Sequence, residues 1–160
     1  MLFLRVGLMF CFLFGSLLTT APQALAEKKP PLADSYILID KSENKLTYYF
    51  HRTAVKSFPV ATGKTQADTP VGVFPVVMKV KNPWYLKKDI PGGDPHNPLG
   101  SRWIGLEVPG TDGSKYGIHG TNRPSSIGQH VSAGCVRMYN QDVAWLYDHA
   151  PIGTVVEIVE

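Results

Sequence analysis

Short runs of Val, Ile, Tyr and Phe recur along the chain, and Gly, Pro, Asn and Asp interrupt them every few residues. β-Branched and aromatic residues favour strands, whereas the interrupting residues favour turns. The expected strands are residues 36–39, 46–50, 55–61, 73–80, 103–108, 116–119 and 154–159. Residues 41–44 are expected to form the turn of a hairpin between the first two strands. The pattern therefore predicts a mainly β protein.

One helix is expected near the end of the chain. Val143, Leu146 and Tyr147 share a helical face at spacings i, i+3 and i+4, which is the pattern of an amphipathic helix. Asn140 can serve as its N-cap, and Pro151 ends it. We therefore expect a single β-sandwich or barrel-like domain with one short helix.

Residues 81–100 contain four prolines and three glycines and show no clear period. A loop of this length is uncommon in a compact domain and is often functional. We expect this segment to form a lid or a binding wall.

An apolar run covers residues 6–18 and gives way to Ala24-Leu25-Ala26, a small-x-small sequence. The run has the length of a signal-peptide core and is shorter than the roughly 20 apolar residues of a spanning helix. We expect a signal peptide at 1–26, cleaved after Ala26, a linker at 27–34 and a catalytic domain at 35–160. Because few positive charges precede the run, an uncleaved anchor is the alternative. The protein is expected to be exported to the cell envelope, in the cell wall or periplasm.

Removal of the leader would take away Cys11 and leave Cys135 as the only cysteine. A free thiol in an exported protein indicates chemistry more than packing, because oxidation or pairing normally removes it. The excess of basic over acidic residues is small, so no nucleic-acid partner is expected.

His119 lies sixteen residues before Cys135 and is a candidate partner for its thiol. An adjacent imidazole is expected to lower the pKa of a thiol from roughly 8.5 and to carry a proton to a leaving amine. Gly134 has no side chain, so backbone N–H groups beside Cys135 can come close to a substrate and form an oxyanion hole.

Three ordered blocks of the sequence resemble the L,D-transpeptidase family, which has a YkuD-type catalytic domain. The blocks are residues 59–64 with 69–74, residues 100–106, and residues 118–138. The last block contains Ile118-His119-Gly120-Thr121-Asn122 and Ser132-Ala133-Gly134-Cys135-Val136-Arg137-Met138. Many members carry a histidine at the position of Ala133, and this departure leaves His119 as the sole base.

The resemblance implies a reaction on the stem peptides of bacterial peptidoglycan. Cys135 would attack the carbonyl between the third, diamino residue and the terminal D-residue, D-alanine would leave, and a thioester would remain. An amine of another stem would then form a 3→3 cross-link. His119 would act as base and then as acid, with its ring oriented by the carbonyl of Gly120. Arg137 would bind a substrate carboxylate or favour the thiolate.

Three further residues have two interpretations each. Ser132 either caps the turn before Cys135 or contacts the substrate, and Trp103 either lines the substrate cleft or belongs to the core. His130 lies five residues before Cys135 and is a competing base. We expect it on a surface loop, because the family pattern gives no catalytic role to this position.

The resemblance implies no cofactor, and no two histidines have a spacing typical of metal ligands, so no metal site is expected. The implied partners are a donor tetrapeptide stem and an acceptor amine, without a protein partner. Carbapenem-type inhibitors are expected to acylate Cys135. One alternative function is an L,D-carboxypeptidase, in which water releases the acyl group. Another, of a different class, is a non-catalytic cell-wall-binding module.

Overall fold

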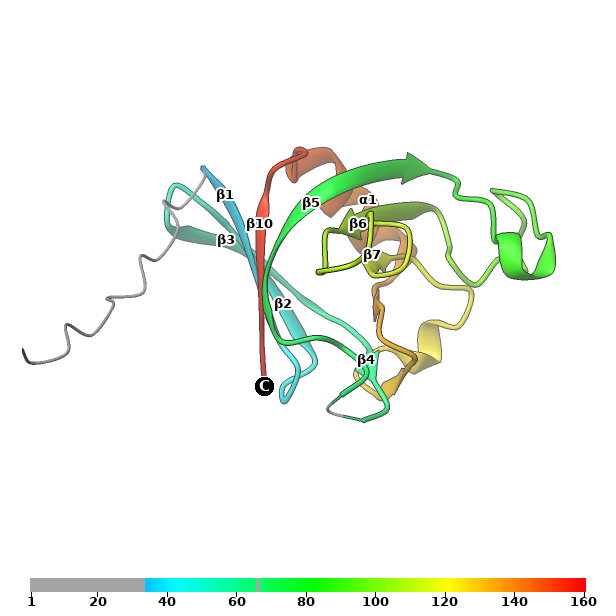
Figure 1. Cartoon of the computed structure of the whole chain (residues 1–160), viewed down its shortest axis with the longest axis horizontal. Coiled ribbons are helices and arrows are strands. Elements are labelled where there is room, and N and C mark those ends of the chain that lie inside the picture. Colours follow the sequence, from blue (N-terminus) through cyan, green and yellow to red (C-terminus); the bar gives the residue numbers. More distant parts are fainter. Residues whose placement is uncertain (1–33, 66) are drawn as a thin grey trace, which may run out of the picture. The chain divides into compact units, whose positions relative to one another are not determined.

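The computed structural model describes residues 34–65 and 67–160. The predicted signal peptide, and the predicted linker except for its last residue, lie outside these residues. An eight-stranded sheet in the order β3-β2-β1-β10-β5-β6-β7-β9 dominates the described chain, and β4 pairs with β8 in a second sheet (Figure 1). The strands are β1 (Ser35–Asp40), β2 (Lys45–Phe50), β3 (Thr53–Pro59), β4 (Thr62–Gly63), β5 (Gly72–Lys81), β6 (Arg102–Leu106), β7 (Gly117–His119), β8 (His130–Ser132), β9 (Val136–Arg137) and β10 (Val155–Val159).

Each of the seven strands expected from the sequence is present in the structure. β1 and β2 pair antiparallel around a turn at residues 41–44, which confirms the predicted hairpin. The sequence does not predict β4, β8 or β9, because strands of two or three residues are too short to show an alternating pattern. These short strands nevertheless matter, since β9 directly follows Cys135.

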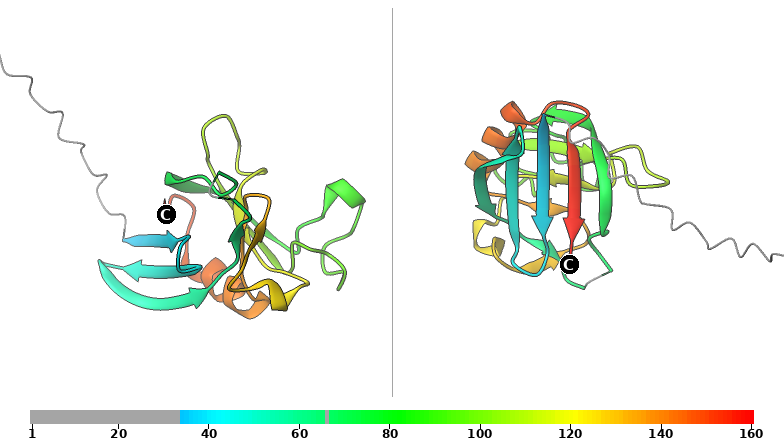
Figure 2. Two further views of the ribbon diagram at one scale, coloured as in Figure 1. Left: turned by 90° about the horizontal axis from the view of Figure 1, so that it is seen from below. Right: turned by 90° about the vertical axis from the view of Figure 1, so that its left-hand side faces the viewer.

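β5 joins two parts of the large sheet, β3-β2-β1-β10 on one side and β6-β7-β9 on the other, and it bends between them. Its first residues pair with β10 and its later residues pair with β6, and the register shifts between Val76 and Met78. A bulge of this kind increases the local twist and lets a strand change direction. Figure 2 shows β3, β2, β1, β10 and β5 side by side as one curved layer. The curled sheet confirms the prediction of a mainly β, sandwich- or barrel-like domain.

Alternate residues of the strands fill the core, as the period of two requires. Ile37 and Ile39 of β1 and Val156 and Ile158 of β10 are almost completely buried. The α-helix α1 (Asn140–His149) contacts β6 and β7 and buries Leu146 against the same core. This packing supports the strand that ends at His119. No helix in the described ranges is long and apolar enough to cross a membrane.

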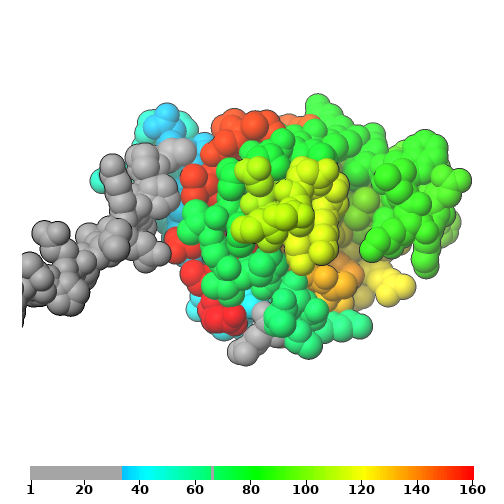
Figure 3. Space-filling view, in the orientation of Figure 1, coloured from blue at the N-terminus to red at the C-terminus, as the bar shows by residue number. Residues whose placement is uncertain are grey.

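The segment between β5 and β6 forms a loop that projects at one end of the domain (Figures 1 and 3). It contains a short 3-10 helix, η1 (Leu86–Lys88). The buried side chain of Asn97 ties the loop together, because its Nδ2 donates hydrogen bonds to the carbonyls of Pro83 (2.8 Å) and Pro91 (3.1 Å). The predicted long loop is therefore present, and internal hydrogen bonds organise it.

Candidate active site

Three neighbouring strands bring Trp103, His119 and Arg137 into one row across the sheet. Trp103 of β6 lies opposite His119 of β7, and His119 lies opposite Arg137 of β9. Residues directly opposite each other point to the same face of a sheet. The rings of Trp103 and His119 are stacked, with centroids 5.5 Å apart and an angle of 18° between their planes.

Cys135 lies immediately before β9, on the same side of the sheet as His119. The parallel register pairs His119 with Arg137, so two residues earlier Cys135 lies beside Gly117. The backbone N–H of Gly117 donates to the sulfur, and Sγ lies 3.5 Å from the carbonyl oxygen of Lys115. Strand geometry then places the Cα atoms of Cys135 and His119 roughly 8 Å apart. The two residues therefore lie on the same face of neighbouring strands, and their pairing as nucleophile and base stays a prediction.

A glycine at position 117 leaves room for the indole ring that supports His119. A Cβ atom at Gly117 would lie 2.8 Å from Cζ2 of Trp103. Trp103 is buried, and its Nε1–H donates to the carbonyl of Gly113 at 2.9 Å. Trp103 therefore supports the His119 ring, and its predicted contact with a substrate stays a prediction.

The ring of His119 is fixed in one tautomer. Its Nδ1 lies 2.6 Å from the carbonyl oxygen of Gly120, and because a carbonyl only accepts, Nδ1 must carry the proton. In the neutral ring, Nε2 is then the nitrogen that carries the lone pair. Burial lowers the pKa of His119 to about 4, and the charge of Arg137 acts in the same direction. Hydrogen bonds to the backbone carbonyls of Gly120 and Leu99 oppose this shift, but too weakly to reverse it. His119 is therefore neutral at neutral pH.

Burial raises the pKa of the Cys135 thiol above its ordinary value. The N–H of Gly117 and the charge of Arg137 both lower that pKa, but burial outweighs them. This corrects the sequence-based expectation of a thiol with a lowered pKa, because the loss of water around a thiolate depends on the tertiary packing. The resting pair is a neutral thiol and a neutral imidazole.

The turn at residues 132–134, just before Cys135, is stabilised by a hydrogen bond and by close packing. The buried hydroxyl of Ser132 accepts a hydrogen bond from the N–H of Gly134 at 3.1 Å, so Ser132 caps this turn. Gly134 has a φ of +127°, and a Cβ atom there would lie 2.6 Å from the carbonyl oxygen of Asp68 and 3.0 Å from the Tyr116 ring. Only glycine fits this position. Because the N–H of Gly134 is already used, it cannot serve as an oxyanion donor in this conformation.

Asn140 connects two loops next to His119, and the sequence gives no sign of this role. Its Oδ1 accepts hydrogen bonds from the N–H groups of Ser101 (3.1 Å) and Thr121 (3.2 Å), and its Nδ2 donates to the carbonyl of Thr121 (3.0 Å). The predicted N-cap is therefore wrong: Asn140 is the first residue of α1, and its side chain binds loops instead of the helix terminus. The contacts fix the turn that carries the Gly120 carbonyl.

Two hollows flank this site. The larger hollow has a volume of about 720 Å³ and is lined by Lys64, Asp68, Arg123, Ser125, Ser126, Gln129, Val131, Ser132, Ala133 and Arg137. The smaller hollow has a volume of about 240 Å³ and is lined by Tyr85, Lys88, Ile90, His96, Pro98, Asn122, Arg123 and Arg137. Both lists contain Arg123 and Arg137, so these two side chains form the boundary between the hollows. No sequence motif marks Arg123 as a site residue.

His130, the competing base, is exposed, as expected, but it is the first residue of strand β8 and does not lie on a loop. Its Nε2 is 3.1 Å from Nδ2 of Asn44, and its Nδ1 is 2.9 Å from Oγ1 of Thr62. Both ring nitrogens are therefore engaged away from Cys135. Within the described part of the chain, no group of three or more His, Cys, Asp or Glu side chains could hold a metal ion.

Comparisons with known proteins point to one family. Residues 34–158 match the family model described as YkuD, the L,D-transpeptidase catalytic domain. The protein YqjB of Bacillus subtilis (strain 168), which bears an L,D-transpeptidase name, is 47% identical over 133 residues. This alignment covers 83% of the present chain and 76% of YqjB.

Solved structures show the same fold at low sequence identity. L,D-transpeptidase 3 from Mycobacterium tuberculosis, solved in complex with a faropenem-derived adduct, has a TM-score of 0.64 at 20% identity and is matched over 79% of the present chain and 60% of its own. The LD transpeptidase LdtMt1, solved in complex with imipenem, has a TM-score of 0.61 at 20% identity, over 79% and 59%. The chain thus spans about six tenths of the length of these two solved chains.

Proposed function

Because the chain belongs to the L,D-transpeptidase family with a YkuD catalytic domain, we propose that it cross-links peptidoglycan stem peptides through a thioester on Cys135. The hydrogen bond between His119 Nδ1 and the Gly120 carbonyl is the observation that carries this proposal. This hydrogen bond makes Nε2 the basic nitrogen of a neutral imidazole. His119 ends β7, the strand next to the segment that carries the Cys135 thiol.

The first step is acylation of Cys135. The sulfur attacks the carbonyl that joins the diamino residue to the terminal D-residue, and the thiol proton moves to Nε2 of His119. The tetrahedral intermediate then collapses, the C–N bond breaks, and His119 returns the proton to the departing amine. A thioester forms on Cys135. The terminal D-residue leaves as a free amino acid whose amino group is neutral.

The oxyanion of this step needs a backbone donor. The N–H of Gly134 is bonded to Ser132, whereas the N–H of Cys135 has no acceptor among residues 34–65 and 67–160. We therefore assign the oxyanion contact to the N–H of Cys135. A preorganised donor of this kind typically contributes a factor of about 10² to 10³ in rate.

The second step transfers the acyl group to an amine. The side-chain amine of the third residue of another stem attacks the thioester carbonyl, and His119 accepts its proton. The C–S bond breaks, a 3→3 amide forms and the thiol is restored. Burial keeps both His119 and Cys135 neutral before each cycle. In the acylation step, transfer of the thiol proton to His119 is therefore coupled to the attack of the sulfur on the substrate carbonyl.

Two further assignments rest on the family. We propose that the protein is exported, with the signal peptide cleaved after Ala26, because its substrate is the cell wall. We also propose that carbapenems acylate Cys135, since the related enzymes of similar fold were solved with a faropenem-derived adduct and with imipenem.

The proposal is tested by incubating the protein with purified disaccharide tetrapeptides and identifying the products by mass. A 3→3 dimer with release of the terminal D-residue supports transpeptidation. Formation of the tripeptide alone would make the protein an L,D-carboxypeptidase. The C135A variant should form neither product, and unchanged activity in that variant would refute the mechanism. Binding of the tetrapeptide without turnover would indicate a wall-binding module.

A further inference from the structure

Two arginine side chains border the same two hollows beside the candidate site. Arg123 and Arg137 line both the larger and the smaller hollow. Among the residues that the structure describes, neither guanidinium makes an ion pair or a side-chain hydrogen bond. Arg137 is only partly exposed, so its unpaired charge is unusual for a residue with structural function alone.

The hollows on both sides of these arginines are positively charged. Lys64 lines the larger hollow and Lys88 lines the smaller one, while Asp68 is the only carboxylate of the described residues that lines either. That carboxylate is partly satisfied, because its Oδ2 accepts a hydrogen bond from the N–H of Thr65 at 2.9 Å. An anionic ligand therefore fits the boundary between the hollows better than a neutral or cationic one.

The backbone of Arg123 is fixed, although its side chain is free. Its N–H donates to Oγ1 of Thr121 at 3.0 Å, and its carbonyl accepts from both the N–H and the hydroxyl of Ser126. Thr121 in turn is held by Asn140. Arg123 thus extends from the turn that also carries the Gly120 carbonyl, and it keeps a defined position relative to His119.

We propose that Arg123 and Arg137 form a two-arginine clamp that binds a carboxylate of the stem peptide, and that Arg123 makes the enzyme select free-acid over amidated stems. The inference rests on the proposed function, since it concerns the same substrate. Arginine presents a planar fork of N–H donors that matches a carboxylate bidentately. A primary amide replaces one acceptor oxygen by a donor and removes the charge, so it cannot satisfy this fork.

Two carboxylates of the substrate have the required chemistry. One is the side-chain carboxylate of the diamino residue, and the other is the terminal carboxylate of the D-residue that leaves. The clamp can bind either of them next to Cys135, since the charge of Arg137 acts directly on the thiol. The test therefore uses three synthetic stems: the free acid, the stem amidated at the diamino residue, and the stem amidated at its C-terminus.

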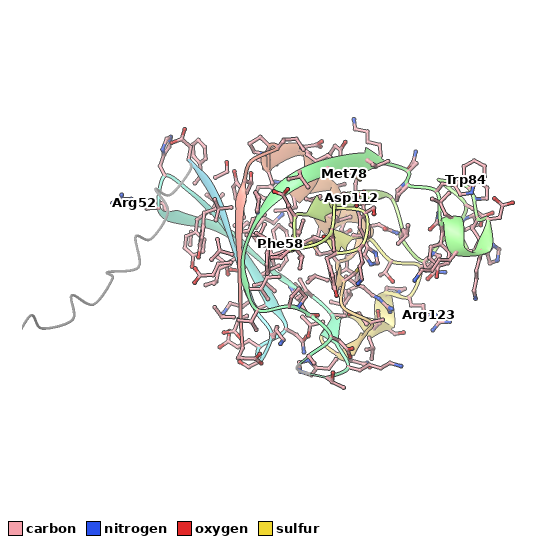
Figure 4. The ribbon with its side chains drawn as sticks, in the orientation of Figure 1. Arg52, Phe58, Met78, Trp84, Asp112 and Arg123 are labelled. Carbon is pink, nitrogen blue, oxygen red and sulfur yellow. The ribbon has the colours of Figure 1, made fainter. Side chains whose placement is uncertain are left out.

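The experiment compares wild type with R123Q, R123K and a matched control, R52Q. Arg52 is exposed in the turn after β2, and Figure 4 shows it at the opposite end of the domain from Arg123. A lost charged hydrogen bond typically reduces kcat/KM by about 10- to 100-fold. We expect R123Q to lose this much on the free acid, R123K to lose less, and R52Q to equal wild type.

The decisive result is the response of the amidated stems. On one of the two amidated stems, wild type should already show the reduced kcat/KM, and R123Q should cause no further loss. The stem that behaves in this way identifies the carboxylate. If R123Q reduces kcat/KM equally on all three stems, or on none, the inference is wrong. If wild type turns over none of the stems, the proposed function itself has failed, and that outcome is distinct.

Discussion

Nδ1 of His119 lies 2.6 Å from the carbonyl oxygen of the next residue, Gly120. The group that orients the His119 ring is thus a main-chain carbonyl, and it selects the tautomer without adding a negative charge. A carboxylate in its place would raise the pKa of the imidazole, whereas the carbonyl leaves burial as the dominant effect. The site therefore holds a neutral base next to a neutral thiol.

Protein stability should fall in acid because of His119. Its pKa is lowered from 6.5 to about 4 in the folded protein, so between these values the unfolded chain binds more protons than the folded one. The contribution is fully present above pH 6.5 and is lost as the pH falls towards 4, by about 3 kcal/mol in total. Urea unfolding of wild type and H119Q at pH 4.5 and 7 measures it. If the free energy of unfolding changes equally between the two pH values in wild type and H119Q, the prediction is wrong.

The reactivity of the thiol should depend on Arg137. The pKa of Cys135 is raised by burial, and the charge of Arg137 partly lowers it again. The R137Q variant should therefore have an even higher thiol pKa and should react more slowly with iodoacetamide at pH 8. The rate is followed by mass spectrometry of the peptide that contains Cys135, with R52Q as the control. Faster alkylation in R137Q would show that the charge acts in the opposite direction.

Substitution of Gly134 should disrupt the site. In G134A the new Cβ would lie 2.6 Å from the Asp68 carbonyl oxygen at a φ of +127°, and strain of this kind costs about 1–3 kcal/mol before any clash. We expect a lower Tm and loss of activity. Gly110 is the matched control, because its φ is +79° and a Cβ there would meet no atom within 4 Å. If G134A and G110A are equally stable, the close packing around Gly134 is not important.

The sequence predicts the parts of the fold that depend on local patterns. The hairpin of β1 and β2 follows from its alternating residues and turn, and α1 follows from Val143 and Leu146, which are both buried. By contrast, β9 has two residues and depends on its pairing with β7 on one side and with Ala61 on the other. The resemblance to the family was needed to identify the segment around it.

The site was predictable in its chemistry but not in its electrostatics. Cys135 and His119 carry a sequence signature, whereas the raised pKa of the thiol arises from burial, which no local pattern encodes. Arg123 was missed because a single arginine in a polar loop has no distinguishing signal. Asn140 was misinterpreted for a related reason, since the groups it binds are distant in the sequence.

Asn140 should control the rate through the position of Gly120. The N140A variant loses three hydrogen bonds to Ser101 and Thr121, whereas N140D keeps the acceptor oxygen and loses only the donor. We expect kcat to fall about 10-fold or more in N140A and less in N140D, with little change in KM, because the substrate does not depend on this side chain for binding.

If Asn140 had only a structural role, its substitution would change the stability of the protein without changing the hydrogen bond of His119 to Gly120. The decisive readout is therefore the ¹⁵N-bound proton on Nδ1 of His119 in the NMR spectrum, which reports the hydrogen bond to Gly120. In N140A this signal should shift or broaden, and in N140D it should stay closer to wild type. The control is N82A, since Asn82 and Asn140 both line a third hollow, of about 210 Å³, but Asn82 has no side-chain hydrogen bond to a described residue. If N140A reduces kcat while the His119 signal is unchanged, Asn140 does not act through Gly120.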